Sequence, residues 1–185
     1  MSPANTTIGD EMLHQYGMLA DYNRWANALV YGAASELTDI EFRDDKGAFF
    51  GSLHRTLNHL IAADRIWMKR FTGTGEAPTA LDSVLFDTLA SLSLARRVED
   101  RRIVEWVSEL DERSLKADFT YTPMTQPIAI TQPLWTGLSH FFNHQTHHRG
   151  QCHMILTALG KPSLALDLAF FLRGDGRKWL QSIPH

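Results

Sequence analysis

Cysteine is nearly absent from this chain, and two other features that would direct its interpretation are missing. Cys152 is the one cysteine in 185 residues, which excludes an internal disulfide and any Cys-x-x-Cys zinc or redox motif. No stretch approaches the run of about 18 apolar residues that a membrane-spanning helix needs. Residues 1–12 have neither a basic patch nor an apolar core and do not resemble a secretory signal. These absences predict a cytoplasmic protein with no membrane partner.

An excess of positive charge is missing as well. The chain has 18 Lys and Arg against 21 Asp and Glu, a formal net charge of -3, so we expect no nucleic-acid partner. Its length predicts one domain spanning residues 1–185, and 44% hydrophobic residues can form a sizeable core. Histidine, by contrast, is abundant: there are nine, and four lie between His140 and His148.

Four long segments have the apolar periodicity of helices, which predicts an all-α fold. Two short segments before the last of them, residues 119–122 and 128–131, have the composition of strands and predict a β-hairpin that caps one end. An extended excursion among long helices favours a four-helix bundle with a long crossover connection over simple up-and-down topology. The predicted helices cover about residues 10–37, 52–71, 82–110 and 131–160.

Several terminal residues support these limits. Asp10, Asp82 and Thr131 are expected to cap the first, third and fourth helices. Thr38 and Glu41 have capping-box spacing, which predicts a short extra turn. After the fourth helix, the apolar segment 164–172 is expected to pack across the bundle.

His144 and His148 form an i, i+4 pair on the fourth helix. At about 100° per residue, His148 shares one stripe with Phe141 and Cys152, and His144 lies about 40° to one side. The stripe must face the core because it carries the apolar residues of the helix. Two inward imidazoles at this spacing can hold one metal ion, as the two histidines of zinc-binding His-Glu-x-x-His helices do.

A third inward histidine is expected on the second helix. His54, Asn58, Arg65 and Lys69 share an arc that we interpret as the solvent-facing side, and His59 lies outside it. Three neutral imidazoles leave a coordination position open and suit zinc, nickel or ferrous iron. The alternative is that all three are ordinary histidines, packed or exposed without an ion.

Three segments resemble the DinB/YfiT-like superfamily of metal-dependent enzymes, over nearly the whole chain. They are residues 22–27, residues 51–67 and, most specifically, Asn143-His-Gln-Thr-His-His-Arg-Gly-Gln151. The resemblance implies a four-helix bundle with a long crossover, commonly a homodimer. It also implies a metal triad of one histidine on the second helix and two on the last, which by motif position are His59, His144 and His148.

Other residues could support such a site. Asn143 and Gln151 flank the motif histidines and could orient them. Trp25 and Trp67, together with Trp135, could line a pocket beside the metal, although core packing is the favoured interpretation. The second helix and the motif also carry residues with two or more interpretations: Asp64 as a base or a packing residue, Arg149 as a ligand for an anion or a carboxylate, and Cys152 as a metal ligand or a buried thiol.

The resemblance leaves the reaction open, since relatives include thiol-dependent transferases and a mycothiol-dependent isomerase. The leading hypothesis is a metal-dependent hydrolase or thiol transferase that activates water or a low-molecular-weight thiol toward a small-molecule substrate. One alternative is a non-enzymatic metal-binding stress-response protein. Another is a metal-free helical interaction module.

Overall fold

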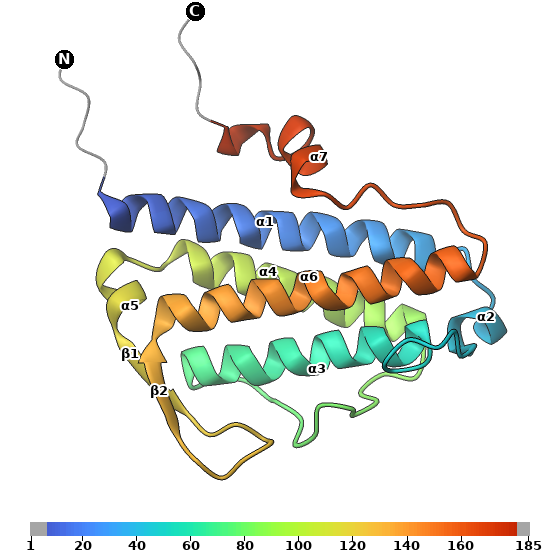
Figure 1. Cartoon of the computed structure of the whole chain (residues 1–185), viewed down its shortest axis with the longest axis horizontal. Coiled ribbons are helices and arrows are strands. Elements are labelled where there is room, and N and C mark those ends of the chain that lie inside the picture. Colours follow the sequence, from blue (N-terminus) through green and yellow to red (C-terminus); the bar gives the residue numbers. More distant parts are fainter. Residues whose placement is uncertain (1–6, 181–185) are drawn as a thin grey trace, which may run out of the picture.

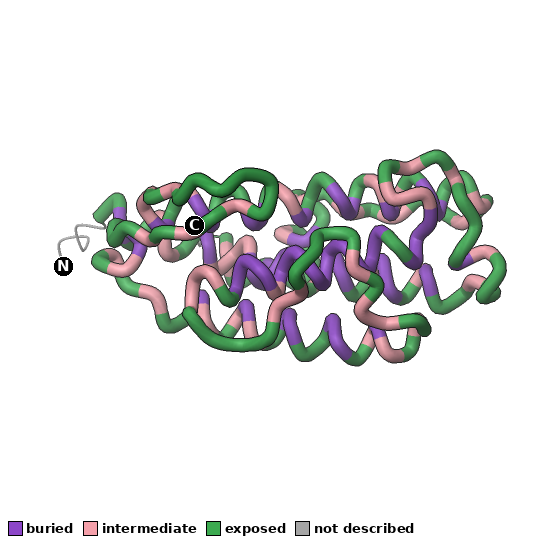
Figure 2. Tube along the Cα trace, turned by 90° about the horizontal axis from the view of Figure 1, so that it is seen from below, coloured by how far each residue is buried: buried purple, intermediate pink, exposed green. Residues whose placement is uncertain are grey.

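The computed structural model describes residues 7–180, in which four long helices form an elongated bundle (Figure 1). They are α1 (Ile8–Ala34), α3 (Leu53–Thr72), α4 (Leu89–Ser108) and α6 (Leu134–Ala158). Helix α1 packs on α4 and α6, and α3 packs on the same two, so α1 and α3 lie diagonally opposite. Buried residues follow the inward side of each helix (Figure 2). The all-α bundle expected from the sequence is confirmed.

The connections make α3 and α4 run in the same direction, and a long crossover joins them over residues 73–88 (Figure 1). The predicted start of the third helix at Asp82 is therefore wrong. Helix α4 begins at Leu89, where the Thr88 hydroxyl caps the backbone N–H of Ser91, and residues 82–88 run back along α3 instead. The crossover lies between α3 and α4, not in the excursion before α6.

Two other caps also differ from expectation. Thr7 caps α1, and Asp10 is the third helical residue, whose carboxylate accepts the Thr7 backbone N–H in a capping box. Helix α6 follows Pro133 directly, because Thr131 pairs in a strand. The capping box of Thr38 and Glu41 is present and begins the short helix α2 (Asp39–Arg43).

The smaller elements close the ends of the bundle. Helix α5 (Glu112–Lys116) precedes strand β1 (Asp118–Tyr121), which pairs antiparallel with β2 (Ile130–Pro133) in the expected hairpin. Helix α7 (Leu168–Arg173) and a 3-10 turn (Arg177–Trp179) lie along α1, where Phe171 packs against Tyr22 as the apolar C-terminal segment predicts. No helix within residues 7–180 is long and apolar enough to cross a membrane.

A polar layer separates two apolar clusters in the core. One cluster contains Leu57 and Ile155, and the other contains Trp67 and Phe141. Between them lie buried ionic and amide side chains of all four helices: Asn23, Asn27, Asp64, Arg96, Asp100, Gln145 and Arg149. The candidate site, described next, is formed by other polar side chains of α3 and α6 in the same middle part of the bundle.

Candidate metal centre

His59 is held in one orientation by the crossover. Its ring is buried on α3, and Nδ1 donates a hydrogen bond to the carbonyl oxygen of Leu81 at 2.8 Å. Because a carbonyl can only accept, the proton lies on Nδ1 and the lone pair of the neutral ring lies on Nε2. The crossover therefore leaves Nε2 available as a metal ligand.

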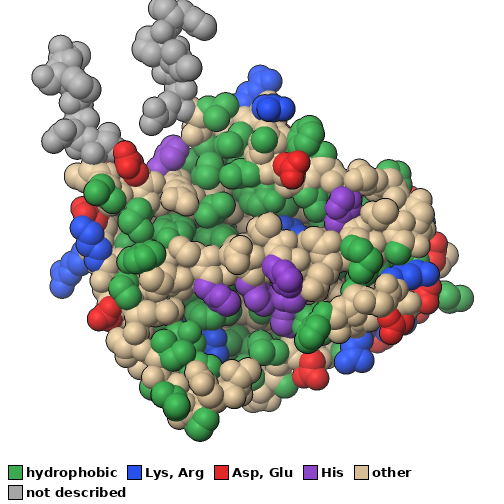
Figure 3. Space-filling view, viewed as in Figure 1, with side chains coloured by type: hydrophobic (Ala, Val, Ile, Leu, Met, Phe, Trp, Pro, Cys, Tyr) green, Lys and Arg blue, Asp and Glu red, His purple; other side chains and the backbone are tan. Residues whose placement is uncertain are grey.

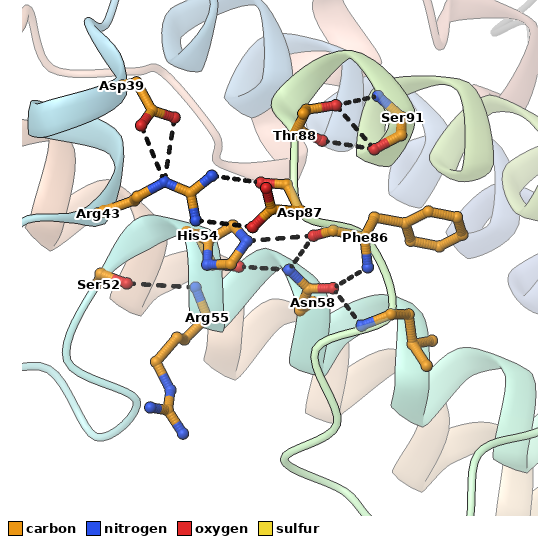
Figure 4. A network of polar contacts seen from close by, with 11 residues as sticks. Asp39, Arg43, Ser52, His54, Arg55, Asn58, Phe86, Asp87, Thr88 and Ser91 are labelled. Atoms are coloured by element: carbon orange, nitrogen blue, oxygen red, sulfur yellow. Dashed lines mark hydrogen bonds and ion pairs between the residues drawn. The ribbon is translucent and has the colours of Figure 1, made fainter.

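Asn58 binds the crossover to α3. Its side-chain oxygen accepts the backbone N–H groups of Leu85 and Phe86 at 2.8 and 2.9 Å, and its amide donates to the Phe86 carbonyl. Figure 4 shows Asn58 beside His54, whose Nε2 lies 3.1 Å from the same carbonyl. The expectation that His54 and Asn58 face solvent is wrong, since the returning crossover covers this side of α3.

His148 is oriented from within its own helix. Its Nδ1 lies 2.9 Å from Oε1 of Gln151, one turn further along α6, and donates to it. The Gln151 amide in turn donates to Nε2 of His147 at 3.2 Å. This arrangement again leaves Nε2 of His148 with a free lone pair, and it places Gln151 where it could orient the ring, as the motif predicts.

The three rings meet at their Nε2 atoms. Nε2 of His59 lies 3.2 Å from Nε2 of His148 and 3.4 Å from Nε2 of His144. A tetrahedral ion with metal–nitrogen bonds of about 2.0–2.1 Å needs ligand nitrogens about 3.3–3.4 Å apart. The Nε2 lone pairs of His59 and His148 point at each other with no proton between them. A cation shared by the two nitrogens would stabilise this arrangement. The three side chains together form a group that could hold a metal ion.

Burial keeps these imidazoles neutral. Desolvation, reinforced by the neighbouring histidines, lowers the pKa of His144 to about 3. Desolvation lowers the pKa of His148 to about 4, even though the Gln151 hydrogen bond acts in the opposite direction. The pKa of His59 is also lowered by desolvation, against the contact with Leu81. Neutral imidazoles are the form that binds metal, so at neutral pH no proton must leave first.

A cavity of about 550 Å³ opens onto the three rings. Its other lining residues are His147 and Gln151 of α6, Phe49 and Phe50 before α3, and Leu81 and Asp82 of the crossover. In Figure 3 a group of histidine side chains lies at the surface in the middle of one face of the molecule. The centre is therefore reachable from solvent, and a ligand of small-molecule size can lie beside it.

Phe50 is a site residue that the sequence did not indicate. Its ring stacks on that of His59 with centroids 4.1 Å apart, at an interplanar angle of 26°. The turn that presents it ends at Gly51, whose φ of 77° is a left-handed conformation that favours glycine. The Phe-Phe-Gly sequence just before α3 was the available signal. Leu81 and Asp82 carried no such signal, because Asp82 was expected to cap a helix and Leu81 only precedes it.

Asn143 and the three proposed pocket tryptophans do not line the cavity at the histidines. Asn143 is exposed on α6. Trp25 packs against Tyr22 and Phe171 beneath the C-terminal segment. Trp67 contacts His140 with tilted rings and belongs to the apolar cluster at the hairpin end, so His140 lies between it and His144. Core packing accounts for both tryptophans, and Trp135 is exposed.

Asp64, Arg149 and Cys152, which had more than one interpretation from the sequence, are part of the core. Asp64 forms an ion pair with Arg96 at 2.5 Å and accepts a hydrogen bond from Gln145, so it is a packing residue of the polar layer. Arg149 donates to Asn23. Cys152 is fully buried among Leu and Ile side chains and lies outside the three-histidine group.

Known proteins resemble this chain in sequence and in fold. The model of the DinB family matches residues 9–180. "Protein DinB" of Bacillus subtilis (strain 168) is 25% identical over 169 residues, covering 83% of this chain and 91% of that protein. The crystal structure of a DinB-like protein from Bacillus cereus ATCC 10987 superposes with a TM-score of 0.63 at 19% identity, covering 86% of this chain and 97% of that one.

Proposed function

This chain belongs to the DinB family, and on that premise we propose that it is a metal-dependent enzyme whose ion is held by His59, His144 and His148. The observation that carries the proposal is the convergence of three Nε2 atoms, two of them with their Nδ1 protons already engaged. We propose zinc, nickel or ferrous iron, because these borderline ions suit a set of imidazole ligands.

The open cavity favours catalysis over simple metal storage. Three protein ligands leave a position free, and the cavity of about 550 Å³ reaches it. A bound ion would lower the pKa of a water or small thiol beside it and could polarise a substrate carbonyl. We propose a hydrolase or a thiol transferase acting on a small molecule. The competing function is a metal-binding stress-response protein without catalysis.

Each surrounding residue has a definable task. Gln151 and the Leu81 carbonyl hold two ligand rings in the required tautomer and direction. Phe50 covers one face of His59 and keeps water from that side. Phe49 is 82% exposed at the mouth of the cavity, where it can contact an apolar part of a substrate.

Elemental analysis of the purified protein tests metal binding. We expect close to one divalent ion per wild-type chain, and far less in His148→Ala. His153→Ala is the matched control, since His153 lies on the same helix and contacts Ser163 instead of the triad. Equal metal content in all three proteins would overturn the proposal.

A second experiment tests catalysis. Metal-loaded protein is screened with low-molecular-weight thiols against electrophiles, and with activated esters and amides, alongside His148→Ala. Turnover that needs the triad supports an enzyme. A full metal complement without any turnover would favour the stress-response protein.

We also propose a homodimer, which sedimentation equilibrium tests directly.

A further inference from the structure

A second cavity, of about 580 Å³, opens between α1 and α4. It shares no lining residue with the cavity at the three histidines, which belong to α3 and α6. Its α1 side is formed at helical spacing by Arg24, Ala28 and Tyr31, and its α4 side by Arg97 and Arg101 among others. The metal centre does not explain why charged residues gather here.

The floor of the cavity contains buried donors. Arg96 is 3% exposed, with one guanidinium nitrogen 2.5 Å from Asp64 and another 3.0 Å from Asp100. Its Nε has no hydrogen-bond partner within residues 7–180, and neither does the hydroxyl group of the buried Tyr31. Neither atom is accessible to solvent, so the contacts that this cavity offers to a ligand come from its exposed side chains.

The rim of the cavity is positively charged. Arg24 pairs with Asp21 at 2.9 Å, whereas Arg97 and Arg101 have no carboxylate within 4.0 Å in the described part of the chain. Four arginines line the cavity, and Asp100 is the one acidic residue among its lining side chains. Asp21 and Asp64 pair with Arg24 and Arg96, so the uncompensated positive charge of the rim is that of Arg97 and Arg101.

The walls between these charges are small and apolar. Ala28 and Gly32 leave room beside α1, and the Tyr31 ring forms part of the surface. An apolar body could lie against them while its anionic end reaches the arginines. Guanidinium groups match the two-oxygen geometry of both phosphate and carboxylate groups.

We propose that the cavity between α1 and α4 binds a small organic oxyanion, a phosphate or carboxylate on an apolar or aromatic body. Arg97 and Arg101 attract and bind the anionic group. The site is separate from the proposed metal centre, and its occupancy does not depend on the metal.

Isothermal titration calorimetry of the full chain tests this site with phenyl phosphate and benzoate as probes. Benzyl alcohol serves as the neutral analogue. We expect saturable binding of at least one anion, weakened by added salt, and no comparable binding of the alcohol. In the double variant Arg97→Gln/Arg101→Gln the affinity should fall at least about tenfold, since one lost charge-assisted contact is of that order. Both arginines are exposed, so the fold should survive.

Two further variants distinguish binding in this cavity from general attraction to surface arginines and from binding at the metal centre. Arg113→Gln removes an exposed arginine that lies away from the cavity, and His148→Ala removes a triad ligand. Both should bind the probe as the wild type does. The proposal is overturned if neither anion binds, if benzyl alcohol binds equally well, or if binding is lost in His148→Ala and kept in the rim variant.

Discussion

The Nε2 atoms of His59 and His148 lie 3.2 Å apart although the residues are 89 positions apart in the chain. The two rings are oriented by different means. The crossover carbonyl of Leu81 holds His59, and a side chain of the same helix, Gln151, holds His148. The geometry of the centre therefore depends on two separate supports. The Gln151 side chain can be removed by substitution, whereas the Leu81 carbonyl belongs to the backbone and can only be displaced by loosening the crossover.

Removing the Gln151 side chain should weaken metal binding without unfolding the protein. Gln151→Ala leaves Nδ1 of His148 without its acceptor, so the ring can rotate and change tautomer. Loss of such an orienting contact typically costs about 10–100-fold in metal affinity. Chelator competition measures the effect. Asn143→Ala is the control, since Asn143 lies in the same motif and is exposed. Equal losses in both variants would contradict the orienting role.

Substituting Asn58 should detach the crossover from α3. Asn58→Ala leaves the backbone N–H groups of Leu85 and Phe86 without their acceptor and withdraws support from Leu81. We expect a loss of about 1–3 kcal/mol in the free energy of unfolding, together with weaker metal binding. Chemical denaturation and metal titration measure the two effects.

Arg43 provides the matched comparison for Asn58. It also joins the crossover, through Asp87, but as an exposed ion pair (Figure 4). Arg43→Ala should cost no more than about 1 kcal/mol. If Arg43→Ala destabilises the protein more than Asn58→Ala does, the surface ion pairs hold the crossover and the assignment to Asn58 is wrong.

The buried ion pair of Asp64 and Arg96 should be costly to break. Asp64→Ala removes one of two carboxylates beside a buried guanidinium, and we expect a loss of about 3 kcal/mol in unfolding free energy. Glu112→Ala breaks the exposed pair with Lys116 and should change stability by less than about 1 kcal/mol. Similar losses in the two variants would show that the polar layer contributes little.

Cys152 should be unreactive in the folded protein. Burial raises the pKa of its thiol to about 12, so at pH 8 only about one molecule in ten thousand carries the thiolate that reacts. Ellman's reagent should label it slowly in buffer and rapidly in denaturant. Because the folded pKa exceeds the unfolded value of about 9, this group's contribution to stability is lost as pH rises above about 9. Fast labelling under native conditions would mean that Cys152 reaches the cavity.

The histidine pair on α6 shows how much helical periodicity can establish. Once the residues around His148 form a helix, the turn of about 100° per residue decides which side chains share a face, and no tertiary contact is needed for that inference. The same geometry placed His59 away from the outer face of α3. The four-helix bundle also followed from local patterns, because long amphipathic helices must cover their apolar sides.

His54 and Asn58 show where this reasoning fails. Their arc carries polar side chains, and a helix considered alone exposes such an arc to solvent. In the protein, residues 82–88 do not extend α4 but return along α3 and supply carbonyl and N–H partners for those side chains. A polar face satisfied by a distant backbone segment has the same local pattern as one satisfied by water.

By itself the sequence determined the helices, the inward direction of His144 and His148, and the types of ligand they offer, because these follow from short-range backbone geometry and side-chain chemistry. Tertiary structure decided what covers the His54 side of α3, how the ring nitrogens are oriented, and which residues line the cavities. Those features arise where segments distant in sequence meet, and a contact between such segments has no periodic signature along the chain.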